Sequence, residues 1–385
     1  MLTTDLDYEL PERLIATHPV EPRDSCRLMV VSRSDPRVLE HRVFRDLPEH
    51  LRPGDAMVFN TSGVLPAKIQ GRRAGTGAAV EGLFIKSLSP GRWELMLKTG
   101  TRLTPGVEVE LHDAHANPTD VRLRLIERAD DRWLAAVVDA AGTTIEKPEG
   151  EVLGRVGATP LPPYIRKARK DRGDATDDDL DRRWYQCVYA EGAASTGSRR
   201  ETGGSVAAPT AGLHFTPGLL DTLAHRGVHR ADVRLHVGIG TFKPVAAERI
   251  EDHPIHSEWI DVPAPAIRTV ERAHASGDRV FAVGTTAVRT LESLPDPLTD
   301  AYRAGGYQAD TTLYVMPGFR FRHVDALITN FHLPRSTLLA MVGALFEPGP
   351  DAGPAGVPRL LELYREAVRE GYRFYSYGDA MLILP

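Results

Sequence analysis

The sequence predicts a discontinuous α/β domain that is interrupted by an inserted antiparallel β domain. Between about residues 80 and 139, short segments alternate apolar and polar residues, with no helical periodicity between them. After residue 200, strand-like and helix-like segments follow one another, which is typical of an α/β layer. Met57 to Asn60, before the β region, also reads as a buried strand. We therefore expect the α/β domain to begin before the insertion and to resume after it.

The inserted region has the pattern of antiparallel strands. Trp93, Leu95 and Leu97 face one way and the residues between them face the other. Turn signals such as Pro90-Gly91 and Pro105-Gly106 separate the segments. Strands are predicted at Val80 to Lys86, Trp93 to Lys98, Val107 to His112, Val121 to Ile126 and Trp133 to Val138. Short strands without helices are typical of a small barrel or a sandwich.

The α/β elements are predicted from apolar runs and their end signals. Pro358 suits a first helical turn, and Gly277 and Gly371 suit helix ends. The predicted strands are Ala231 to Val237, Val280 to Val283, Thr312 to Met316 and Ala326 to Thr329, and the predicted helices are Ala264 to Ser276, Ser336 to Phe346 and Pro358 to Glu370. We expect residues 1–64 and 155–385 to form the α/β domain and residues 65–154 to form the inserted domain.

The composition excludes several classes of protein. Hydrophobic residues make up 42% of the 385 residues and charged residues 26%, which is ordinary for a globular protein and unlike disordered or fibrous chains. The net charge of -5 argues against indiscriminate coating of nucleic acid. Apolar runs such as Leu338 to Phe346 are too short to span a bilayer. Asp5 and Asp7 argue against a secretory signal, so we expect a cytoplasmic protein without a membrane partner.

Two segments have the composition of a binding or catalytic site. Gly204 to Thr216 and Thr329 to Leu339 each combine hydroxyls, a histidine and a helix start, and neither has a clean apolar period. Polar turns of this kind between apolar runs are where binding sites are built. Val283 is likewise followed by Gly284-Thr285-Thr286, and Val237 by a Gly-x-Gly turn. Backbone N–H groups exposed after a strand suit a nucleotide or a carboxylate, although Gly-x-Gly also fits a plain tight turn.

The histidines do not form a convincing metal motif. His253 and His256 have an HxxH spacing, but Pro254 lies inside it and no HExxH glutamate is present, so we expect no metal. Cys26 and Cys187 are too far apart in sequence for a cysteine-based zinc site or a disulfide framework. His214 and His332 remain as acid–base groups or as satisfied structural histidines.

The chain resembles the S-adenosylmethionine:tRNA ribosyltransferase-isomerase family of queuosine biosynthesis over nearly its whole length. The segments that carry the resemblance are residues 7–27, 161–165 (LPPYI), 185–190 (YQCVYA), 204–216 (GSVAAPTAGLHFT), 235–242 (LHVGIGTF), 256–259 (HSEW), 282–293 (AVGTTAVRTLES), 324–339 (VDALITNFHLPRSTLL) and 371–383 (GYRFYSYGDAMLI).

The resemblance implies a fold and an activity. The fold would be an α/β domain with an inserted antiparallel β-barrel. The enzyme would transfer the ribosyl part of S-adenosylmethionine to the 7-aminomethyl-7-deazaguanine wobble base of tRNA, releasing adenine and methionine and giving epoxyqueuosine. S-adenosylmethionine would be a co-substrate and no cofactor would be bound. The partner would be the tRNA anticodon region, and we expect a monomer without an obligate protein partner.

Such a reaction requires a general base, a donor for the departing adenine and a wall around the sulfonium cation. The candidates for proton transfer are His214 and His332, with the carboxylates Glu258 and Asp379 as alternatives. The candidates for substrate binding are Thr210, Gly212, Phe215, Gly238, Thr241, Thr285, Thr286, Arg289, Asn330, Phe331 and Tyr377. From basic segments, the candidates for RNA contact are Arg166, Lys167, Arg320 and Arg322, although such runs are also common in solvated loops.

Two departures from the family pattern leave alternatives open. The family's FNDTRV reads FNTSGV at residues 59–64, which loses an acid and an arginine, and residues 191–203 look like an inserted loop. One alternative is an S-adenosylmethionine-dependent paralogue with a different acceptor. The other is a non-catalytic RNA-binding protein, which the acidic net charge disfavours.

Overall fold

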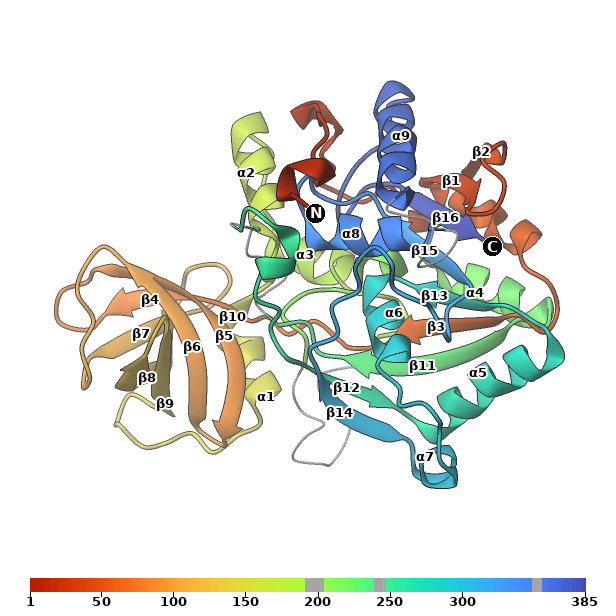
Figure 1. The fold of residues 1–385 in the computed structure, drawn as a ribbon. Helices are drawn as coiled ribbons and strands as arrows, with labels where there is room; N and C mark the ends of the chain where they lie inside the picture. The colour runs from red at the N-terminus through yellow and green to blue at the C-terminus, as the bar shows by residue number, and fades with distance from the viewer. Residues whose placement is uncertain (191–203, 239–244, 246, 348–354) are drawn as a thin grey trace.

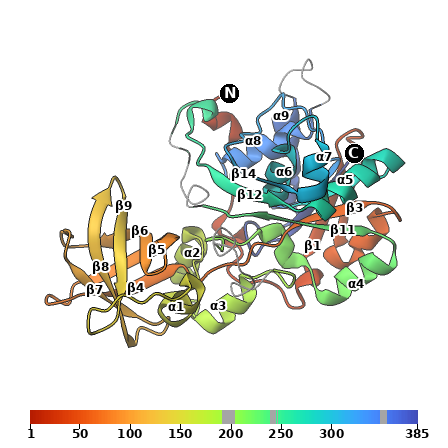
Figure 2. The same cartoon turned by 90° about the horizontal axis from the view of Figure 1, so that it is seen from below.

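The computed structural model describes residues 1–190, 204–238, 245, 247–347 and 355–385. Figure 1 shows a barrel of strands set beside a larger α/β domain, and the turned view in Figure 2 shows the same separation. The predicted fold class, a discontinuous α/β domain with an inserted antiparallel β-barrel, is therefore confirmed. The boundaries of the two domains remain a prediction.

The α/β domain is built on a mixed sheet with the order β14-β12-β11-β3-β13-β15-β16-β1-β2. Its strands are β1 (Arg27–Ser32), β2 (Leu39–Val43), β3 (Ala56–Asn60), β11 (His229–Leu235), β12 (Glu258–Val262), β13 (Val280–Val283), β14 (Tyr307–Thr311), β15 (Ala326–Asn330) and β16 (Ala380–Leu384). At its centre, β13 pairs in parallel with β3 and with β15, so the carboxyl ends of these strands share one edge.

Helices cover both faces of this sheet. On β13, Val280 and Ala282 belong to one buried cluster and Phe281 and Val283 to another, as the two-residue period of a strand requires. The first cluster includes side chains of α5 (Ala264–Ser276), α6 (Thr285–Glu292), α8 (Thr337–Ala344) and α9 (Gly356–Arg369). The second includes side chains of α4 (Pro217–His225) and of the 3-10 helix η4 (Phe44–His50).

The inserted barrel has its own core. Its strands are β4 (Lys68–Arg73), β5 (Ala79–Ser89), β6 (Arg92–Thr99), β7 (Glu108–His112), β8 (Pro118–Ala129) and β9 (Arg132–Val138). They follow the order β4-β5-β6-β9-β8-β7, and pairing of β7 with β4 closes the barrel. The side chains of Trp93 and Leu95 point into the barrel core, as their alternation predicts.

Short elements connect the two parts. α1 (Glu149–Val156) packs Val152 and Leu153 into the barrel core, and β10 (Gly157–Ala158) pairs with β4. The chain then forms α2 (Pro163–Arg172) and α3 (Asp178–Trp184), with α7 (Asp300–Gly305) much later. The buried guanidinium of Arg169 on α2 donates two hydrogen bonds of 2.7 Å to Asp181 on α3.

One predicted strand is wrong. Residues 312–316 are not a strand; β14 is the preceding segment, Tyr307–Thr311, and it pairs with β12 at the sheet edge. The chain leaves the sheet at Thr311, whose hydroxyl bonds Ser293 and accepts the backbone N–H of Leu313. The apolar side chains beyond it line a cavity and the core instead. Among the described helices, none combines the length and apolar character needed to cross a membrane.

Candidate active site

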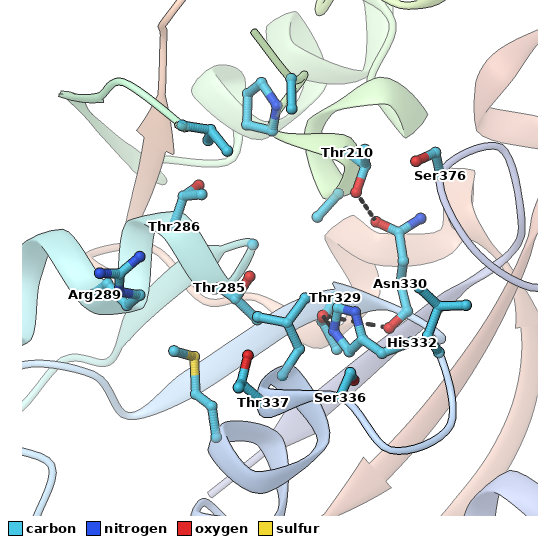
Figure 3. A pocket seen from close by; sticks show the side chains of 18 of the residues that line it. Thr210, Thr285, Thr286, Arg289, Thr329, Asn330, His332, Ser336, Thr337 and Ser376 are labelled. Carbon is cyan, nitrogen blue, oxygen red and sulfur yellow. Dashed lines mark hydrogen bonds between the residues drawn. The ribbon is translucent and has the colours of Figure 1, made fainter. Parts of the chain in front are cut away.

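A cavity of about 560 Å³ opens at the carboxyl edge of the parallel strands, a size that suits a small-molecule ligand. Its lining brings together the two polar segments identified in the sequence, Gly204 to Thr216 and Thr329 to Leu339. The start of α6, residues 253–256, residues 313–315 and residues 375–376 form further parts of the wall, some of which Figure 3 shows.

Two helix starts face the cavity. β13 ends at Val283, Gly284 turns the chain with a φ of 88°, and α6 begins at Thr285. After β15, a turn leads to α8, which begins at Thr337. The side chains of Thr285 and Thr337 both lie at the cavity (Figure 3). The unpaired N–H groups and the dipole of a helix start favour anionic groups such as a carboxylate.

One end of the cavity carries a buried ion pair. Arg289 on α6 bonds Glu258 on β12, whose other oxygen accepts the backbone N–H of Gly238 at 3.0 Å. The Arg289 Nε donates to the Leu313 carbonyl at 3.2 Å. These contacts position the guanidinium at the cavity wall without using all of its donors.

Three polar atoms of the lining are buried without a hydrogen-bond partner among the described residues. They are Nη2 of Arg289, Oγ1 of Thr286 and Oγ of Ser336. Buried polar groups in folded proteins are almost always paired, so each such group requires an explanation. Their shared position in one cavity places three polar groups where a bound polar ligand is able to pair with them.

The opposite end of the cavity is aromatic. The rings of Tyr164 and Tyr375 lie 4.6 Å apart, centroid to centroid, and Phe331 is also part of the lining. The Tyr164 hydroxyl bonds the hydroxyl of Ser376. Flat, largely apolar faces of this kind suit a heterocycle or a cation.

Asn330 ties the two polar segments together. Its Oδ1 accepts a 2.9 Å hydrogen bond from the Thr210 hydroxyl, which Figure 3 draws as a dashed line. Its Nδ2 lies 3.1 Å from Nε2 of His214 and donates to the Tyr375 carbonyl, also at 3.1 Å. One side chain therefore bonds two residues of the Thr210–His214 helix and the backbone of Tyr375.

His214 lies behind Asn330 and outside the cavity lining. Because the amide nitrogen of Asn330 donates to Nε2, the proton of the ring lies on Nδ1, 3.3 Å from Sγ of Cys26. Burial, with the charges of Arg373 and Arg23, lowers the pKa of His214 to about 3. The ring is therefore neutral and positions Asn330.

His332 lies in the cavity lining. Its Nε2 lies 2.8 Å from the Thr329 hydroxyl, and its Nδ1 has no hydrogen-bond partner in the described part of the chain. Burial lowers the pKa of His332 to about 4. A neutral imidazole with an unused nitrogen at the cavity is able to accept a proton or a hydrogen bond.

The other predicted site residues divide between the cavity and its surroundings. Those in the lining, besides His332 and Glu258, are Thr210, Thr285, Thr286, Arg289, Asn330 and Phe331. Those outside the lining, besides His214, are Gly212, Phe215, Gly238, Tyr377 and Asp379. Thr241 lies outside the described residues.

The residues outside the lining have identifiable packing roles. A Cβ on Gly212 would lie 1.9 Å from the Tyr189 hydroxyl, so only glycine fits there. Phe215 packs edge to face against Phe44 in the core. Asp379 accepts backbone N–H groups at 3.0 Å and 2.8 Å, including that of Arg27 at the start of β1. Tyr377 belongs to a separate buried cluster.

The predicted RNA-contact residues differ in whether their charged groups are already paired within the protein. Arg166 on α2 and Arg320 are exposed and have no ionic or hydrogen-bond partner among the described side chains. Lys167 lies 3.2 Å from Glu12. Arg322 donates to the carbonyls of Glu292 and Leu294, which occupies its guanidinium in holding the end of α6.

Sequence reasoning missed several lining residues. They include Tyr164, Tyr314, Ser336, Thr337, Tyr375, Ser376 and the HxxH histidines His253 and His256. A signal was present for most of them, because all but Tyr314 and His253 lie in the segments that carry the family resemblance. In the described ranges, no cluster of three or more His, Cys, Asp or Glu side chains has the geometry of a metal site.

The fold and the cavity are those of an α/β protein with a pocket of small-molecule size at the carboxyl edge of its sheet. The comparisons with known proteins specify the family. Residues 3–383 match the family described as queuosine biosynthesis protein, and the chain belongs to this family. The resemblance predicted from the motifs is thereby confirmed.

Similar proteins match along their whole length. The chain is 44% identical to the S-adenosylmethionine:tRNA ribosyltransferase-isomerase of Moorella thermoacetica and 43% identical to that of Thermotoga maritima, with 100% of both chains covered in each comparison. A crystal structure of S-adenosylmethionine tRNA ribosyltransferase from Thermotoga maritima matches with a TM-score of 0.51 at 34% identity. That match covers 99% of this chain and 100% of the other.

Proposed function

We propose that this protein transfers and isomerises the ribosyl part of S-adenosylmethionine onto the 7-aminomethyl-7-deazaguanine wobble base of tRNA. The products are epoxyqueuosine-tRNA, adenine and methionine. The observation that carries the proposal is the match of the whole chain to enzymes named for the same transfer. The segments that carry the likeness also contribute the walls of one cavity with unpaired polar groups.

The polar end of the cavity is proposed to hold the methionine part of S-adenosylmethionine. The unpartnered Nη2 of Arg289 and the hydroxyl of Thr286 suit a carboxylate, and the start of α6 adds N–H groups. Glu258 then orients Arg289 rather than transferring a proton, because both of its oxygens are engaged. The aromatic end is left for the adenosine part and the sulfonium.

His332 is the proposed proton acceptor. A sulfonium acidifies the neighbouring ribose 5′ hydrogens, and their removal allows adenine to leave. The amine of the tRNA base then attacks the ribosyl group, and a ribose hydroxyl closes the epoxide as methionine departs. Nδ1 of His332 faces no other described partner, whereas His214 is neutral and acts through Asn330. General-base assistance of this kind contributes about 10² to 10⁴ in rate.

The tRNA is proposed to approach across α2. Tyr164 at the start of α2 lines the cavity, and the exposed side chains of Arg166 and Lys170, one helical turn apart, have no ionic partner among the described residues. Free cations next to the site suit the phosphates of an anticodon stem. Replacing both by glutamate should raise the KM for tRNA and flatten its salt dependence, while the Kd for S-adenosylmethionine stays unchanged.

Three further expectations are also proposals: that the protein is a monomer, that it is cytoplasmic, and that its domains are formed by residues 1–64 with 155–385 and by residues 65–154. No cofactor besides the co-substrate is proposed.

The test is incubation of the purified protein with S-adenosylmethionine and precursor tRNA carrying the aminomethyl base. We expect adenine and methionine to appear in equal amounts with incorporation of the ribosyl group into tRNA. A matched tRNA with unmodified guanine at the wobble position is the control and should not be labelled. Adenine release without incorporation would support a different acceptor, and tRNA binding without either product would support a non-catalytic binder.

A further inference from the structure

Tyr375 has a backbone conformation that non-glycine residues rarely adopt. Its φ is +72°, in the left-handed region where a Cβ is crowded by the backbone. The residue is only 6% exposed, so solvent does not explain the conformation. Strained positions of this kind concentrate at functional sites, where the surrounding structure maintains them.

Hydrogen bonds from three directions hold this backbone in place. The Tyr375 N–H donates to the Phe331 carbonyl at 3.0 Å. Its carbonyl accepts the Asn330 side chain at 3.1 Å and the N–H of Gly378 at 2.9 Å. Asn330 is in turn bonded to His214. Hydrogen bonds from both polar segments thus support one strained residue.

The side chain of Tyr375 is a free donor at the cavity. It lines the cavity beside Tyr164, and its hydroxyl has no hydrogen-bond partner in the described part of the chain. The other three cavity tyrosines differ, because the hydroxyl of Tyr164 bonds Ser376, that of Tyr314 bonds the Ile250 carbonyl, and that of Tyr185 interacts with Ser376 and the Ala208 backbone. Burial raises the pKa of Tyr375, so the hydroxyl keeps its proton throughout the physiological range.

We propose that the Tyr375 hydroxyl donates a hydrogen bond to the adenine of bound S-adenosylmethionine and stabilises this base as it leaves. The inference rests on the proposed function. Adenine suits the aromatic end of the cavity, and the Arg289 end suits the methionine part. As the bond from ribose to adenine breaks, its electron pair moves to the base, and the donor stabilises that charge while the proton stays on the tyrosine oxygen. The strained backbone persists because it directs this hydroxyl into the cavity.

Tyr375→Phe tests the donor, because it removes one oxygen atom and keeps the ring. We expect the kcat for adenine release to fall about 10²-fold, the usual effect of losing one transition-state donor. The KM for S-adenosylmethionine, the pH profile and the thermal midpoint should change little. Tyr372→Phe is the matched control, since its hydroxyl bonds His41 outside the cavity, and it should keep wild-type turnover. Wild-type turnover in Tyr375→Phe overturns the proposal.

A second pair of variants tests the backbone. Glycine tolerates a positive φ and alanine does not, so Tyr375→Gly should unfold at a higher temperature than Tyr375→Ala. Both should lose adenine release, because both lack the hydroxyl. An alanine variant more stable than the glycine variant, or a fully active glycine variant, contradicts the proposal. If the wild-type protein itself forms no adenine from S-adenosylmethionine and precursor tRNA, the proposed function fails instead, and the order of thermal midpoints still reports the strain.

Discussion

Replacing His214 with glutamine should make the protein less sensitive to acid. The pKa of His214 is lowered to about 3 by burial and by two nearby arginines, whereas an exposed histidine titrates near 6.5. Below about pH 6.5 His214 therefore binds a proton in the unfolded chain but stays neutral in the folded chain. Stability from this source is complete above that pH and is lost progressively as the pH falls toward 3.

The size of the effect follows from the two pKa values. At about pH 5 the unfolded imidazole is almost fully protonated and the folded one is neutral, which lowers the free energy of unfolding by about 2 kcal/mol relative to pH 8. Glutamine does not titrate, and its side-chain oxygen still accepts a hydrogen bond from Asn330. The His214→Gln variant should therefore lose about 2 kcal/mol less than the wild type between these two pH values.

Urea unfolding of both proteins at pH 8 and pH 5 measures this difference directly. His225→Gln on α4 is the matched control, because it replaces an exposed imidazole by the same residue and leaves the buried His214 in place. If the His214→Gln variant loses as much stability as the wild type, His214 is not the buried neutral group that the geometry indicates.

Three further predictions concern other named contacts. Arg169→Met should lower the free energy of unfolding by about 3–5 kcal/mol in urea, since it leaves the buried Asp181 carboxylate without its partner; a change below about 1 kcal/mol would contradict this. Gly212→Ala should cost about 1–3 kcal/mol by crowding the Tyr189 hydroxyl, and a thermal midpoint equal to that of the wild type would show that the ring moves freely. His332→Gln should lower kcat by about 10² to 10⁴ with no new pH dependence between pH 6 and 9, because the pKa of His332 lies near 4; unchanged kcat would remove this residue as the base.

Local sequence signals were sufficient for elements whose ends are set locally. α5 has the predicted bounds, Ala264 to Ser276, because Gly277 ends it in a left-handed conformation. β6 contains the predicted alternation from Trp93 to Lys98. The strand predicted at Thr312 to Met316 was wrong, because the apolar residues of this segment line a cavity and the core rather than one face of a strand.

The sequence predicted which segments meet at the cavity, but not which of their side chains reach it. Polar segments between apolar runs predicted Thr210, Thr285 and Asn330 as site residues, and all three line one cavity. His214 and His332 occur in similar polar segments, yet one lies behind Asn330 and the other at the cavity. Whether a side chain reaches the cavity or lies behind its wall depends on how β15 packs against the 3-10 helix at Thr210–His214. No local sequence pattern encodes this packing.

The place of β16 in the sheet has a consequence for how the chain folds. β16 lies between β15 and β1, and its pairing with β1 joins segments about 350 residues apart in sequence. During synthesis, β1 and β2 therefore cannot join the rest of the sheet until β16, its last strand in the sequence, has been made. Tyr375 lies shortly before β16 in the sequence, so the aromatic end of the cavity is completed in the same late step. A chain that stops before this step exposes an open sheet edge and has no complete cavity, so it is prone to aggregation and lacks the proposed binding site.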